Sequence, residues 1–223
     1  MQKFATAAPV SAVLDIPAGQ VHLIAADRAD ATVEVRPADA SKSRDVKAAE
    51  LIEVSFADGV LRVVAAEATN RLTGNSGFVD VTVQLPAGSS IEATLAAVEV
   101  RSKGRLGDVV LEAAQAQVQL DETAATRVTV QAGDVTLGRL NGQAEISTQK
   151  GDITITEAVQ GALKLNTQHG NISVGAARGV SATLDAGTGY GRIHNALQNA
   201  EGAAAPLTIE ATTAYGDISA RSI

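Results

Sequence analysis

The feature that most constrains the fold is a short motif that recurs along the chain. It has one glycine or alanine, one mostly polar residue and an aliphatic–polar–aliphatic triplet, which is degenerate in the last copies. The copies begin 17 to 25 residues apart, at Ala96, Ala116, Gly133, Gly151, Gly170, Gly191 and Gly216. A unit of about 20 residues cannot bury its own apolar face, so such units stack on one another. The repeat therefore predicts a solenoid.

The residues before each motif indicate what the unit is made of. Ala144 and Ile146 alternate with Glu145 and Ser147, and the other units repeat this alternation. A period of two is typical of a strand with one buried face. Each unit is thus expected to be a strand, a tight turn and a second strand.

Stacking places equivalent residues of successive units in columns. We expect an inward aliphatic column, stacked in sequence order, of Val98, Val118, Val135, Ile153, Ile172, Ile193 and Ile218. An outer column alternates in charge through Arg127, Glu145, Lys164 and Asp185, and a hydroxyl column near a bend holds Thr148, Thr167, Thr188 and Thr213. Only 2% of the residues are aromatic, so the core is expected to be aliphatic.

The prediction for the whole chain is an all-β, single domain over residues 1–223, a right-handed parallel β-helix or β-solenoid. Residues 89–223 are expected to form about seven rungs, and the hand follows the general preference of parallel β connections. Residues 1–88 are a looser β region with polar loops at 37–47 and 67–77. Residues 57–59 predict a hairpin turn, and residues 45–51 a short helix.

Composition excludes several classes of function. The net charge of −7 is the wrong sign for gripping nucleic acid. The chain has no cysteine, so disulfides and thiolate metal sites are excluded. No segment approaches the roughly 20 apolar residues that cross a bilayer, and no signal peptide is evident. We therefore expect no direct membrane insertion and a cytoplasmic location, with envelope association through a partner as the alternative.

The residue just before each glycine of the motif is the best candidate for recognition. Lys150, His169, Tyr190 and Tyr215 occupy this position and differ in character more than any other exposed column. We interpret them as a binding stripe. The alternative is that they only cover the corner of the solenoid.

Other candidate sites have structural explanations. The acids that follow the glycines could in principle hold cations, but Asp and Asn also favour turns. His22, His169 and His194 are widely spaced and are expected to be solvated. Residues 74–77, Gly-Asn-Ser-Gly, faintly resemble a serine protease nucleophile segment without identifiable partners. We predict no metal, no cofactor and no catalytic residue.

Three groups of residues resemble a known family. They are the serial glycine motifs, residues 58–63 and residues 78–89. In number and order they resemble the bacterial putative-adhesin, or toastrack, β-strand-repeat family, from about Val13 to Ile218. The resemblance implies a right-handed β-helix-like fold and a link to adhesion or envelope-stress signalling, and it implies no catalytic residues.

The function predicted is therefore that of a non-catalytic interaction or scaffold protein that binds a protein or a glycan. One alternative is a structural protein that assembles end to end through its open strand edges. A remote alternative is a polysaccharide-active enzyme. Glycoside hydrolysis needs two carboxyl groups about 5 to 9.5 Å apart, whereas the outer column sets opposite charges side by side.

Overall fold

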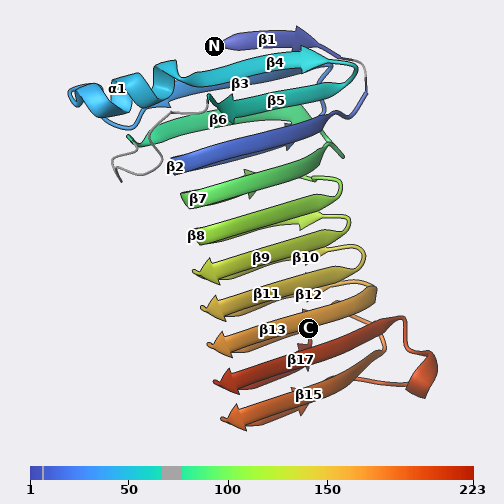
Figure 1. Ribbon diagram of the computed structural model, residues 1–223. Helices are drawn as coiled ribbons and strands as arrows, with labels where there is room; N and C mark the ends of the chain where they lie inside the picture. The colour runs from blue at the N-terminus through green and yellow to red at the C-terminus, as the bar shows by residue number, and fades with distance from the viewer. Residues whose placement is uncertain (7, 67–76) are drawn as a thin grey trace. The chain divides into compact units, whose positions relative to one another are not determined.

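The computed structural model of the protein describes residues 1–6, 8–66 and 77–223 (Figure 1). The strands are β1 (Gln2–Ala5), β2 (Ser11–Ala26), β3 (Asp30–Pro37), β4 (Ile52–Ala57), β5 (Val60–Ala65), β6 (Val79–Pro86), β7 (Ser90–Lys103), β8 (Val109–Thr123), β9 (Thr126–Ala132), β10 (Val135–Leu140), β11 (Ala144–Lys150), β12 (Ile153–Ala158), β13 (Gly161–His169), β14 (Ile172–Ala176), β15 (Ala182–Tyr190), β16 (Ile193–Ala196), β17 (Leu207–Tyr215) and β18 (Ile218–Ser222). The helices are α1 (Ser43–Glu50) and the short 3-10 helix η2 (Gly202–Ala204). The chain forms two compact units, Met1–Ala116 and Gln117–Ile223.

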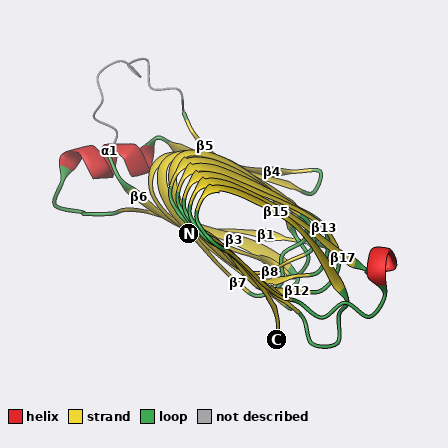
Figure 2. Ribbon diagram, turned by 90° about the horizontal axis from the view of Figure 1, so that it is seen from below, coloured by secondary structure: helices red, strands yellow, loops and turns green. Residues whose placement is uncertain are grey.

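The second unit is built from two parallel ladders. One ladder runs β9, β11, β13, β17, β15, and the other runs from residues 118–123 of β8 through β10, β12, β14, β18, β16. Figure 2 looks along the direction in which these strands stack and shows the two layers facing each other. The predicted strand–turn–strand unit is confirmed for this part of the chain.

The spatial order of the last strands differs from their order in the sequence. β17 lies between β13 and β15 (Figure 1). In the other ladder, β18 lies between β14 and β16. The expectation of a stack in strict sequence order is therefore wrong for the last two pairs. The physical reason lies at the first inward position of the two strands, where β15 has Ala182 and β17 has the larger, fully buried Leu207. β17 carries Ile209 inward and suits an internal position.

The core between the ladders is aliphatic, as the composition predicts. Its longest column runs, in spatial order, through Val118, Val135, Ile153, Ile172, Ile218 and Ile193. The first five side chains are at most 1% exposed, but Ile193 is 46% exposed. The next column ends with Ala220 and then Asn195. The core thus tapers at β15 and β16.

The first unit is organised around the long strand β2. From Ser11 to Ile24, β2 pairs in parallel with β7. On its other side the first part of β2 pairs with β5 and the second part with β6. Buried and less buried residues alternate along β2, with even-numbered residues buried up to Ala18 and odd-numbered residues buried from Val21. This shift by one residue marks a corner.

The rest of the first unit is antiparallel. β4 and β5 form the predicted hairpin, whose turn has positive φ at Asp58 and Gly59. β3 pairs with β1 on one side and with β6 on the other. The polar stretch 37–47 leads into α1, which lies beside β6 (Figure 2) and begins at Ser43, two residues earlier than predicted. Of the predicted loop 67–77, residues 67–76 lie outside the described residues.

Candidate functional site

Each strand pair that follows β8 in the second unit is joined by a corner with a glycine. At Gly151 φ is +148°, and a Cβ atom would lie 2.1 Å from the carbonyl oxygen of Gly133. Only glycine tolerates both this conformation and this approach. The residues on either side of the glycine therefore take the same position in every rung.

The residue after the corner glycine continues a column of hydrogen bonds. Its backbone N–H donates to the side-chain oxygen of the preceding rung: Asp152 to Asp134 (2.9 Å), Asn171 to Asp152 (2.7 Å), Asp217 to Asn171 (2.9 Å) and Arg192 to Asp217 (2.8 Å). The acids that follow the corner glycines, which are also candidate cation ligands, thus accept the backbone N–H of the next corner. Arg192 ends the column and offers no acceptor to a further rung.

A second column of hydrogen bonds lies just inside the corner. The threonine hydroxyls donate to glycine carbonyls: Thr167 to Gly151, Thr213 to Gly170 and Thr188 to Gly216, each at 3.0 Å. The predicted hydroxyl column is confirmed. Its first member, Thr148, is 2% exposed, and its hydroxyl has no partner among the described residues.

The residue before the corner glycine forms the set that we call the aromatic column. It consists, in spatial order, of Lys150, His169, Tyr215 and Tyr190. Each is the last residue of its strand, so the column follows the arrow ends of β11, β13, β17 and β15 in Figure 1. All four predicted binding residues are therefore brought together, with Tyr215 inside the column and Tyr190 at its end.

The three rings of the aromatic column stack on one another. The ring centroids of His169 and Tyr215 are 5.0 Å apart, with an angle of 11° between the planes. Tyr190 and Tyr215 are also 5.0 Å apart and nearly parallel, at 3°. This spacing is close to the roughly 4.8 Å between adjacent strands. The tyrosines remain 72% (Tyr190) and 52% (Tyr215) exposed, so the ring edges face solvent.

The other histidines lie outside the aromatic column. His194 is in register with Ser219 in the second ladder. His22, in the first unit, lies 3.8 Å from a carboxylate oxygen of Asp80. Tyr190 lies at the corner that joins β15 to β16. Residues 74–76 of the Gly-Asn-Ser-Gly motif lie outside the described residues.

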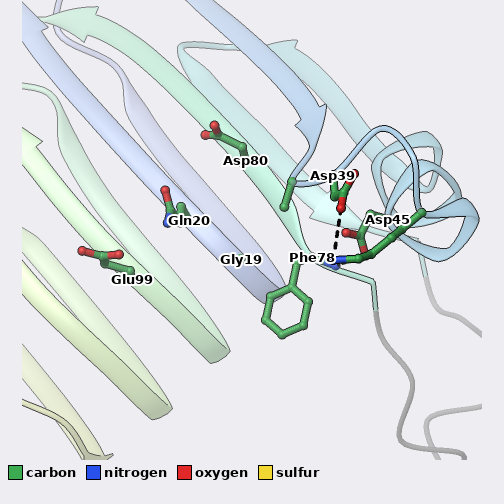
Figure 3. A pocket seen from close by; sticks show the side chains of 9 residues that line it. Gly19, Gln20, Asp39, Asp45, Phe78, Asp80 and Glu99 are labelled. Atoms are coloured by element: carbon green, nitrogen blue, oxygen red, sulfur yellow. Dashed lines mark hydrogen bonds and ion pairs between the residues drawn. The ribbon is translucent and has the colours of Figure 1, made fainter.

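Sequence reasoning missed a polar pocket of about 540 Å³ in the first unit (Figure 3). It is lined by Gly19, Gln20, Ala38, Asp39, Lys42, Asp45, Phe78, Asp80 and Glu99. These residues come from β2, β6, β7, α1 and the segments beside them, so no local pattern in the sequence connects them. The buried Asp45 carboxylate accepts the Phe78 N–H at 3.0 Å and ties α1 to the start of β6.

The carboxylates of this pocket have different roles. The hydroxyl and backbone N–H of Ser41 both donate to Asp39 and, with help from Lys42, lower the pKa of Asp39 to about 2. Asp39 thus stays ionised and shapes the loop before α1. Throughout the described parts of the chain, no group of three His, Asp or Glu side chains is placed to hold a metal ion.

Comparisons with known proteins agree with this architecture. The sequence model of the Toastrack DUF4097 family matches residues 11–222. A putative adhesin from Bacteroides fragilis is similar in structure, with a TM-score of 0.60, 14% identity and coverage of 98% of this chain and 95% of that chain. A putative adhesin from Parabacteroides distasonis is also similar in structure, with a TM-score of 0.51, 14% identity and coverage of 98% of this chain and 95% of that chain. At such identities the similarity shows the fold, which is all-β and solenoid-like. No curated protein matches the sequence.

Within the described residues, neither helix is long and apolar enough to span a bilayer.

Proposed function

The chain belongs to the Toastrack DUF4097 family, and from this premise we propose that it is a non-catalytic binding protein that holds its partner at the aromatic column. The proposal includes the fold predicted from the sequence. The chain is a single domain over residues 1–223, and its C-terminal part is a right-handed coil of about seven rungs. The two putative adhesins of similar fold are named for adhesion, and we extend a binding role of that kind to this chain.

One observation carries the proposal. In a chain with 2% aromatic residues, both tyrosines and one of three histidines are stacked at adjacent strand ends and exposed there. Stacking restricts the side chains before a partner arrives, so little conformational entropy is left to lose on binding. Aromatic groups with a polar tip are typical anchors of binding surfaces.

The chemistry of the aromatic column defines the class of partner. The ring edges and the outer face of Tyr190 offer apolar contact, while Lys150 and His169 donate hydrogen bonds. Such a surface suits an extended peptide or the apolar face of a sugar. The proposed partner is accordingly a protein or a glycan.

The aromatic column carries its own spectroscopic probe. Tyr190 and Tyr215 are the only tyrosines, and the chain has no tryptophan, so tyrosine fluorescence reports on this column alone. We would titrate the protein with a panel of defined oligosaccharides and extended peptides. At least one probe is expected to change the fluorescence and to show saturable binding by calorimetry.

The double variant Tyr190→Ser, Tyr215→Ser is expected to abolish that calorimetric signal. Leu51→Ser, which changes an exposed apolar residue of the first unit, is the matched control and should bind like the wild type. Equal binding by the double variant would overturn the proposal. So would a complete lack of binding across the panel.

A further inference from the structure

β15 is the edge strand of the ladder that carries the aromatic column. β15 pairs with β17, and no described strand is in register with its other side. An unpaired edge presents backbone N–H and C=O groups to solvent. At the start of β15 the Ala182 N–H donates to the Gln198 carbonyl oxygen at 3.1 Å. The edge available for pairing therefore extends from there to Tyr190.

The outer charge column shows which charge a further strand must carry. Arg127 and Glu145 form an ion pair at 2.9 Å, and Lys164 is in register between Glu145 and Glu210. The column then ends with two acids side by side, because Asp185 is in register with Glu210. Opposite charges across a strand pair stabilise it and like charges destabilise it. The side chain in line with Asp185 should therefore be basic.

The aromatic column shows which side chain the further strand should carry five residues after its basic residue. Tyr215 has a ring stacked on each face, His169 on one and Tyr190 on the other. Tyr190 is stacked on one face and is 72% exposed. A planar side chain in line with Tyr190 would continue the stack. All pairings in this ladder are parallel, so the added strand should be parallel too.

A second copy of this chain is disfavoured as the occupant. Two identical β15 edges would meet about a two-fold axis and so pair antiparallel, which does not continue the parallel ladder. Both copies would also bring Asp185 and Glu210 to the contact, in a protein whose net charge is −7. A further rung would also leave one corner N–H without a side-chain acceptor. Asp134, Asp152 and Asp217 each accept the N–H of the next corner, but the Arg192 side chain has no acceptor atom. Charge complementarity instead favours a basic segment from another protein.

We propose that the edge of β15 binds an extended segment of a partner protein as an added parallel strand. This segment has a lysine or arginine in line with Asp185 and an aromatic residue five positions later in line with Tyr190. Backbone hydrogen bonds provide the affinity and these two side chains the specificity. The inference rests on the proposed function, because it uses Tyr190 as part of the binding site.

The chain itself supplies a template for the probe. β13, whose sequence is Gly-Ala-Leu-Lys-Leu-Asn-Thr-Gln-His, has its lysine and its aromatic residue at this spacing. The probe is a nine-residue peptide with this sequence and His169→Phe, which adds no tyrosine signal. One control peptide also carries Lys164→Glu. A second carries Asn166→Pro, which removes a backbone donor and disfavours pairing.

The expected result is saturable binding of the probe, with a change in tyrosine fluorescence. The glutamate peptide should bind about tenfold more weakly, because one attraction becomes a repulsion, and the proline peptide should not bind measurably. The protein variant Asp185→Lys should prefer the glutamate peptide over the lysine peptide. Because Asp185 is exposed and lies beside Glu210, this variant should stay folded, which circular dichroism checks.

Several outcomes would overturn the inference. They are failure of the probe to bind, equal binding of the proline peptide, and no reversal of preference in Asp185→Lys. Growth of the protein's mass with concentration would instead assign the edge to a second copy. If a ligand from the panel binds and is lost in the double tyrosine variant while all three peptides fail, the proposed function stands and this inference fails.

Discussion

At the scale of single residues, the corners of the second unit assign one task to each side chain. Asp152 illustrates the arrangement: its N–H donates to Asp134, and its carboxylate accepts the N–H of Asn171. Arg192 occupies the same position at the end of the column, where nothing requires an acceptor. The same position is therefore structural in one rung and unconstrained in another.

Asp152→Ala is expected to lower the free energy of unfolding by about 1 kcal/mol, because the Asn171 N–H loses its side-chain acceptor. The matched control Arg192→Ala removes no acceptor and should leave that free energy unchanged. Urea unfolding followed by circular dichroism measures both. A control that is destabilised as much as Asp152→Ala would contradict the capping role.

Thr148→Val is expected to raise the free energy of unfolding by about 1 kcal/mol, because it removes a buried hydroxyl that has no partner among the described residues. Thr167→Val, one rung further, deletes the hydrogen bond to Gly151 and should lower it by about 1 kcal/mol. The opposite signs test the hydroxyl column by the same unfolding measurement. Destabilisation of both variants would show that the Thr148 hydroxyl is satisfied.

Ser41→Ala is expected to raise the pKa of Asp39 from about 2 towards 3.8, because the hydroxyl donor is the largest cause of the lowered value. A lowered pKa in the folded state favours the ionised carboxylate, so its contribution to stability is present above pH 3.8 and is lost as the pH falls through 2. The titration is followed by carboxyl NMR. Ser55→Ala, an exposed change on β4, is the control, and an identical midpoint in Ser41→Ala would refute the assignment.

At the scale of elements, the corner decides where one strand ends and the next begins. Where the corner contains a glycine, as at Gly151, two separate strands flank it. Where it contains Ala96 and Ala97, β7 runs through the bend, and only the parity of its buried residues changes. The period of two in the sequence predicted these strands well, because burial of one strand face is a local pattern.

Gly151→Ala is expected to lower the free energy of unfolding by more than about 2 kcal/mol, because of its positive φ and the contact with the Gly133 carbonyl. Gly187→Ala is the matched control within a strand. A Cβ there would meet no atom within 4 Å, so the change should stay within about 0.5 kcal/mol. Thermal unfolding measures both, and a neutral Gly151→Ala would mean that the corner can relax.

At the scale of the whole molecule, the spatial order of the last strands determines which surface is open. Because β17 and β18 are internal, the edge strands at this end of the second unit are β15 and β16 rather than the C-terminal strand. A test of end-to-end assembly must therefore change residues 182–196 and not residues 218–223. The exposed acids of this edge and Arg192 disfavour growth by identical copies.

Light scattering during size-exclusion chromatography is expected to give a mass near 22.7 kDa at all concentrations in physiological salt. The physical reason is the repulsion between acidic edges, with no cap for a further corner. A mass that increases with concentration would contradict this and support self-assembly. In that case Asp185→Lys would be compared with the wild type, to see whether the edge of β15 is the interface.

The sequence by itself determined the repeat, the alternating strands, the aliphatic core, the corner glycines and the membership of the column Lys150, His169, Tyr190 and Tyr215. All of these follow from local spacing, since each rung repeats the same burial and the same turn. Only the tertiary structure decided that Tyr215 lies between His169 and Tyr190, that the pocket around Asp45 exists, and that β15 is the open edge. These depend on which rungs bury each other's apolar faces, and Arg192 makes physical sense only once its rung is seen to be the last.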